Sequence, residues 1–239
     1  MVKSIAFRVS FAAALFVVFL VPTVEAMPVT VPPDLSPGDQ YRLAFVTSGV
    51  HDATSTDITT YNDFVRAEAN SEPLLLSLAT TWRAIGSTSA VDARDNTATN
   101  PSSSVGVPIY NLSGSRIANN NADLWDGTIL ASLSIDQHGV GFFFNVWTGT
   151  AQSGVGATPS RQLGAPTSVK LGSAGSTDSR WVDRAISAAG SEQRLYGISA
   201  VLSVTAVPEP STFALSFLSA VGLAASTLRR IIWLHPQAS

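Results

Sequence analysis

The sequence predicts an α+β fold, in which one mainly β domain with a single early helix and long loops lies between two apolar segments at the ends of the 239-residue chain. Apolar and polar residues alternate in several short stretches, which is typical of half-buried strands. Only one stretch has helical spacing, and Ser, Thr, Asn and Gly fill the long intervals between stretches. Because helices do not alternate with strands along the chain, a parallel α/β sheet is not expected.

The first predicted strand covers residues 41–47, where Tyr41, Leu43 and Phe45 share one face. A helix is predicted over residues 57–70, because the apolar residues of this segment fall on one helical stripe. The apolar stripe begins at Ile58, and the N-cap candidates Ser55, Thr56 and Asp57 stand directly before it.

Four further strands are predicted from shorter patterns. Residues 82–85 and 107–112 are short candidates, and residues 141–148 form a dense apolar run that is typical of a central strand. In residues 196–204, apolar side chains alternate with Gly and Ser, which predicts a terminal strand.

Composition excludes several classes of function. The chain has no cysteine, which excludes disulfide scaffolds, thiolate metal sites and a cysteine nucleophile. Its net charge is −3, so a nucleic-acid partner is not expected, because phosphate binding needs clustered Lys and Arg. The three histidines, His51, His138 and His235, are scattered and leave little for zinc chemistry or acid–base triads.

Residues 1–26 have the three parts of a secretory signal peptide. Lys3 and Arg8 supply the positive charge, and residues 9–21 are apolar apart from one serine. Small or modest residues near Ala26 predict cleavage between Ala26 and Met27. An uncleaved membrane anchor is the alternative, but the short apolar run and the proline after it favour cleavage. This segment therefore predicts export.

Residues 211–228 carry no charge and, as a helix, would span about 27 Å, close to the thickness of a hydrocarbon core. Arg229 and Arg230 follow directly, and basic residues favour the cytoplasmic side of a membrane. A transmembrane helix with a cytoplasmic C-terminus is therefore predicted. A buried helix of the domain is the alternative, but the segment has no polar face.

Just before this segment stands the sequence Val207-Pro208-Glu209-Pro210-Ser211-Thr212, in which two prolines hold the backbone extended. The motif, the apolar segment and the arginine pair together resemble the PEP-CTERM sorting signal of Gram-negative bacteria. The resemblance implies recognition by an exosortase, removal of the tail and delivery to the cell surface or extracellular polymer. Residues 231–239 depart from the usual abrupt basic ending of such signals.

The order of short motifs between Tyr41 and Val204 is similar to that of the endostatin-type branch of the C-type-lectin-like fold. These motifs are Trp82-Arg83-Ala84, residues 106–112, Leu124-Trp125-Asp126-Gly127, residues 146–150, Trp181 and the terminal strand. The resemblance implies that the first and last strands pair and that Trp82, Trp125, Trp147 and Trp181 anchor the core. The disulfides usual in that fold are missing, including the cysteine expected before Trp181.

Asp92, Asp95 and Asn96 offer the oxygen ligands that calcium prefers, so calcium is the one cofactor that the sequence suggests. A bound ion would also stiffen the loop of residues 96–106. The alternative is that these side chains cap loops and that Arg94 forms an ion pair, because their spacing matches no defined calcium loop.

No catalytic residue is predicted. No Gly-x-Ser-x-Gly elbow occurs, and His51 and His138 fall in polar, turn-like segments where solvated loop histidines are expected. Asp123 and Asp126 flank a tryptophan and could act as paired carboxylates beside a sugar platform. The alternative is a buried Trp125 followed by a turn at Asp126 and Gly127.

Together these observations predict a signal peptide at residues 1–26, an extracytoplasmic domain at 27–206 and a sorting signal at 207–239. The expected protein is a non-enzymatic binding or structural component of the envelope or exopolysaccharide. Its expected partners are an exosortase-type peptidase, the inner membrane before processing, and a polysaccharide or surface protein afterwards. A secreted glycan-active hydrolase and a protein-binding adhesin are the alternatives.

Overall fold

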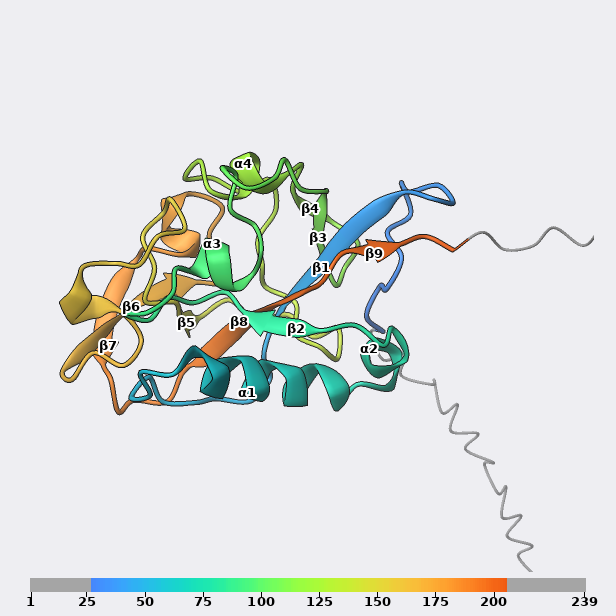
Figure 1. Cartoon of the computed structure of the whole chain (residues 1–239). Coiled ribbons are helices and arrows are strands. Elements are labelled where there is room, and N and C mark those ends of the chain that lie inside the picture. Colours follow the sequence, from blue (N-terminus) through green and yellow to red (C-terminus); the bar gives the residue numbers. More distant parts are fainter. Residues whose placement is uncertain (1–26, 206–239) are drawn as a thin grey trace, which may run out of the picture.

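A mixed sheet of nine strands runs through residues 27–205, the part of the chain that the computed structural model describes (Figure 1). Seven strands follow one another in the order β4-β3-β1-β8-β5-β6-β7, while β2 pairs with β8 and β9 pairs with β1. The strands are β1 (Gln40–Val46), β2 (Trp82–Ala84), β3 (Ile109–Asn111), β4 (Arg116–Ala118), β5 (Asn145–Trp147), β6 (Ser168–Ser173), β7 (Ala185–Ala188), β8 (Arg194–Ser199) and β9 (Leu202–Ser203).

The first and last strands pair, as the resemblance to the endostatin-type fold implied. β1 runs antiparallel to both β8 and β9, with Ala44 opposite Ile198, and parallel to β3 on its other side. Six of the seven residues of β1 are buried, which places this strand in the interior of the sheet. The described ends of the domain are thereby brought close together, since Gly38 N donates to Val204 O at 2.9 Å.

Helix α1 (Ile58–Asn70) covers one face of the sheet, and its predicted cap is present because Asp57 accepts a hydrogen bond from Thr59 N. Its buried residues join one apolar cluster, whereas the short helices α3 (Ala93–Asn96) and α4 (Asn121–Leu124) contribute to a second cluster on the other face. Figure 1 shows α1 beside β2 and β8, with α3 and α4 on the opposite side. A Cβ at Gly197 would lie 2.6 Å from Phe45 and Val65, so this glycine allows α1 to pack closely.

The four tryptophans that were expected in the core are buried: Trp82, Trp125, Trp147 and Trp181 are 3%, 6%, 0% and 0% exposed. The ring centroids of Trp125 and Trp181 lie 5.6 Å apart, and Trp181 also contacts Tyr196. In a chain without disulfides, such large buried side chains supply much of the packing that stabilises the fold.

Two strand predictions were partly wrong. In residues 141–148 only β5 is a strand, and Phe143 and Phe144 are 64% and 71% exposed. The ladder between β5 and β6 ends at Asn145 and Ser173, and beyond it one bond from Ala174 N to Phe144 O remains.

The terminal strand predicted over residues 196–204 is broken between β8 and β9. At this break the hydroxyl oxygen of Ser199, in place of a backbone carbonyl, accepts the hydrogen bond from Leu43 N at 3.0 Å.

The sequence patterns did not predict several short elements: β4, β6, β7, α2 (Pro73–Ser77), α3, α4 and the 3-10 turns Pro159–Arg161 and Ser179–Trp181. Apart from α1, the helices have five residues or fewer, which agrees with a mainly β fold. Within residues 27–205, no helix combines the length and apolar character needed to cross a bilayer. The predicted signal and transmembrane helices lie outside these residues.

Candidate functional site

Three neighbouring hollows surround α3, and Asp95 lines all of them. One, of about 250 Å³, lies between Arg42 and Arg83, and another, of about 480 Å³, extends from Arg83 along α1. The third, of about 230 Å³, lies beside Asp92. The concave surface around α3 is therefore the candidate site.

Arg42 and Arg83 reach the first hollow from strands on either side of β8. Ile198 of β8 is opposite Ala44 of β1 and Arg83 of β2, so the alternation of strand residues places Arg42 and Arg83 on the same face. Arg42 Nη1 donates to Thr97 O at 2.7 Å, and Arg83 Nη1 donates to Asn96 O at 3.0 Å. Both guanidinium groups therefore converge on the end of α3.

Arg42 is a buried cation without an acidic partner. Its side chain is 6% exposed, and its Nε has no hydrogen-bond partner in the described structure. No carboxylate of residues 27–205 forms an ion pair with Arg42 or Arg83. Burial, and then the charge of Arg83, lower the pKa of Arg42 to about 10. Sequence reasoning missed this site, although an arginine inside an otherwise apolar strand pattern was a signal that could have revealed it.

Two asparagines close the free edge of β2 beside this hollow. Asn62 Oδ1 accepts a hydrogen bond from Ala84 N at 2.9 Å, and Asn96 Nδ2 donates to Ala84 O at 2.8 Å. Both backbone groups of Ala84 that face away from β8 are therefore paired with side chains. Another chain cannot add to β2 at this position unless it displaces them.

The residues predicted to bind calcium are only partly brought together. Asp92 and Asp95 line the same hollow, where Asp92 Oδ1 accepts from Gly156 N at 2.7 Å and Asp95 Oδ1 accepts from Asn100 Nδ2 at 2.6 Å. Asn96 is buried, and its amide is bonded to Asn62 and Ala84. Within residues 27–205, no three His, Cys, Asp or Glu side chains cluster as metal ligands. Calcium binding at Asp92 and Asp95 stays a prediction.

Asp123 and Asp126 both bond to their own loop. Asp123 Oδ2 accepts from Asn119 N at 2.6 Å, and Asp126 Oδ1 accepts from Thr128 N at 2.9 Å. Trp125 between them is buried and donates from Nε1 to Thr99 Oγ1 at 3.0 Å, so it presents no open platform for a sugar. The geometry matches the alternative of a buried tryptophan and a turn, in which Gly127 has a φ of +105°.

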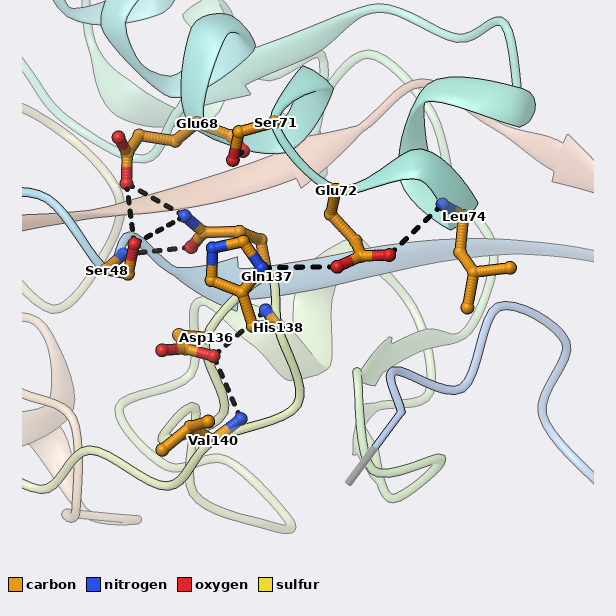
Figure 2. A network of polar contacts seen from close by, with 9 residues as sticks. All are labelled: Ser48, Glu68, Ser71, Glu72, Leu74, Asp136, Gln137, His138 and Val140. Carbon is orange, nitrogen blue, oxygen red and sulfur yellow. Dashed lines mark hydrogen bonds and ion pairs between the residues drawn. The ribbon is translucent and has the colours of Figure 1, made fainter. Parts of the chain in front are cut away.

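A buried polar network connects the C-terminal end of α1 to two loops (Figure 2). Gln137 is fully buried and donates from Nε2 to Ser48 Oγ at 2.7 Å and to Glu68 Oε2 at 2.9 Å. The same Glu68 oxygen accepts from Gly49 N at 2.6 Å. This arrangement satisfies each group locally, which is typical of a structural network and not of an open reactive centre.

The two described histidines have different surroundings. His138 is 43% exposed and lies 3.2 Å from a Glu72 carboxylate oxygen, as Figure 2 shows. His51 is more enclosed than predicted, because its ring packs edge-on against Tyr61 and Phe64 at centroid distances of 5.5 and 5.1 Å. No acid–base pair with a nucleophile is formed by these two groups in the described structure.

Several predicted residues lie outside the described part of the chain: the sorting residues Val207, Pro208, Glu209, Pro210, Arg229 and Arg230, and the cleavage residue Ala26. Met27 is the first described residue. A comparison with curated proteins finds no match. A comparison with protein families matches residues 206–230 to the PEP-CTERM protein-sorting motif. This motif indicates a protein that passes through the membrane during export and is sorted by exosortase, a membrane peptidase.

Proposed function

We propose that this protein is delivered to the cell surface or extracellular polymer, where its domain of residues 27–206 acts as a non-enzymatic binding or structural component. The sorting motif at residues 206–230 is the observation that carries the proposal. After signal-peptide cleavage between Ala26 and Met27, the domain would cross the membrane first. The uncharged segment 211–228 would then stop transfer, with Arg229 and Arg230 on the cytoplasmic side.

In this proposal the extended segment around Glu209 is the part that the peptidase grips. Pro208 and Pro210 restrict the backbone to extended conformations, so the segment is already arranged for binding in an active-site groove. Cleavage there would release the folded domain from its membrane segment.

A C-type-lectin-like fold is part of the same proposal. Its support is the pairing of β1 with β8 and β9, together with the four buried tryptophans. The resemblance to that fold implies both features.

A non-enzymatic role is favoured over a hydrolase because Asp123 and Asp126 are each bonded to nearby backbone amides. Incubation of the purified protein with polysaccharides separates the two roles. Retention of a polysaccharide without release of reducing ends supports the proposal, whereas release of reducing ends establishes the hydrolase. A protein-binding adhesin would show neither and would be found by capture of a surface protein.

Sorting is tested in an exosortase-containing bacterium with an epitope tag after Ser239. The wild-type protein is expected outside the cell without the tag, as measured by mass spectrometry of its C-terminal peptide. Replacement of Pro208, Glu209 and Pro210 by Ala is expected to leave the tagged protein in the membrane fraction. The matched control is Glu192→Ala, which removes an exposed glutamate in the domain. An intact tail in extracellular wild-type protein would overturn the proposal.

A further inference from the structure

We propose that the hollow between Arg42 and Arg83 binds the carboxylate of a uronic-acid residue in an acidic polysaccharide. The proposal rests on the proposed role as a binding component and names the class of ligand. It starts from the two guanidinium groups and the surfaces beside them.

The first step is the uncompensated charge of Arg42. A buried ion normally has a counter-ion, because removing a charge from water is costly. Arg42 is 6% exposed, yet it bonds only a backbone carbonyl, and its Nε has no partner in the described structure. An anion in the adjoining hollow would supply the missing opposite charge.

The second step concerns the donors that remain free. Arg42 and Arg83 each use Nη1 to bond the end of α3, and Nη2 of neither residue bonds to any other described residue. Both side chains line the hollow, which has a volume of about 250 Å³. Two guanidinium groups that converge on one space are well suited to an oxyanion, since their planar N–H groups match its oxygens.

The third step limits the charge of the ligand. Asp95 lines the same hollow, so the three ionised side chains together carry one positive charge. A singly charged carboxylate neutralises this set, whereas a doubly charged phosphate would leave an excess charge near Asp95. The lining therefore favours a carboxylate.

The fourth step distinguishes a sugar from a peptide. Peptides commonly bind by adding a strand to an open sheet edge, but Asn62 and Asn96 occupy the edge of β2 at Ala84. The hollow continues into the larger one along α1, which shares Thr81, Arg83, Asp95 and Asn96 with it. The hydroxyl side chains of Thr59 and Thr81 there match the hydroxyl groups of a neighbouring sugar.

Calorimetry on the full chain in an uncharged detergent tests this site. The probes are a galacturonate oligomer, a neutral glucose oligomer of equal length, acetate, and a peptide with a free C-terminal carboxylate. The galacturonate oligomer is expected to bind, more weakly at high salt, and the other three are expected to bind at least about tenfold more weakly. Equal binding of the neutral oligomer, acetate or the peptide would overturn the proposal.

Variants locate the binding. Arg83→Gln, at an exposed position, is expected to weaken galacturonate binding roughly tenfold to hundredfold. Arg42→Met is expected to weaken binding to the same extent; it removes an unpaired buried charge but also the donor to Thr97 O, so its melting temperature is measured alongside. The control Arg180→Gln removes an exposed arginine that is paired with Asp178, and is expected to bind normally. Unchanged binding in Arg83→Gln would contradict the site even if Arg42→Met failed to fold.

This result is separable from the proposed role of the protein. Loss of the galacturonate site would leave the sorting experiment standing, because that experiment depends only on the C-terminal tail. Release of reducing ends from the galacturonate oligomer would instead overturn the non-enzymatic role while leaving the arginine site in place.

Discussion

Asn62 and Asn96 exchange hydrogen bonds between their side-chain amides in both directions, at 3.0 and 2.9 Å, and so join α1 to α3 across the edge of β2. Each amide also bonds a backbone group of Ala84. The backbone carbonyl of Asn96 in turn accepts a hydrogen bond from Arg83. This pair therefore holds the wall of the arginine hollow in place.

Replacement of Asn96 by Ala is expected to destabilise the protein by about 1–3 kcal/mol, because it leaves the half-buried Asn62 Nδ2 and the buried Ala84 carbonyl without partners. Urea denaturation followed by tryptophan fluorescence measures this free energy of unfolding. The control is Asn70→Ala at the exposed end of α1, where a change within about 0.5 kcal/mol is expected. An equal effect of the two substitutions would show that the amide pair is not important for stability.

The network of Glu68 and Gln137 makes a second prediction (Figure 2). Glu68→Ala removes the acceptor of Gly49 N and Gln137 Nε2, and a cost of about 1–3 kcal/mol is expected. In a double-mutant cycle with Gln137→Ala, the two effects should fall short of additivity by roughly 0.5–3 kcal/mol, because both residues belong to one network. Strictly additive free energies of unfolding would mean that the bond between them contributes nothing.

A third prediction concerns the contact between β6 and the turn at Trp181. A Cβ at Gly172 would lie 2.1 Å from the Trp181 carbonyl oxygen, so Gly172→Ala forces backbone atoms apart and is expected to cost about 1–3 kcal/mol. Gly190→Ala is the matched control, since a Cβ there meets nothing within 4 Å. The melting temperatures of the two variants measure the difference. A Gly172→Ala protein as stable as the control would show that the two segments can separate easily.

The elements that could be predicted are those whose pattern is local. Residues 41–47 and 57–70 correspond to β1 and α1 because their apolar spacing matches the faces that pack into the core, on both sides of β1 and on one side of α1. The run around Phe143 misled the prediction, because its apolar residues suggest burial while the partner strand ends at Ser173. The sorting tail was also predictable from a local pattern, because its motif, its apolar segment and its arginine pair are contiguous in the sequence.

The arginine hollow could not be predicted in the same way. Arg42, Arg83 and Asn96 are brought together by the pairing of β1 and β2 with β8, and no local spacing reports that pairing. The burial of Arg42 also depends on α3, which is too short to show a helical period. Asp92 and Asp95 were noticed because they are close in sequence, whereas the two arginines that share a hollow with Asp95 come from β1 and β2.

The last prediction concerns the stability of the fold at alkaline pH, to which all four tyrosines contribute in the same direction. Tyr41, Tyr61, Tyr110 and Tyr196 are all buried, and burial is the main cause that raises the pKa of each phenol above its usual value near 10. The charge of Asp52 raises the pKa of Tyr61 further, and the hydrogen bond to Asp34 does so for Tyr110.

The sign of the effect follows from proton binding. Above pH 10 the unfolded chain releases phenol protons that the folded chain retains, so the contribution of the tyrosines to stability is constant below about pH 10 and falls as the pH rises further. Arg42 acts in the opposite direction, because its lowered pKa of about 10 lets the folded protein lose a proton that the unfolded chain keeps. One arginine does not offset four tyrosines, so net destabilisation is expected. Tyrosinate absorbance at 295 nm should therefore rise in one cooperative step, coincident with the loss of circular dichroism. A tyrosine that ionises near pH 10 while the circular dichroism stays native would contradict the burial of these four side chains.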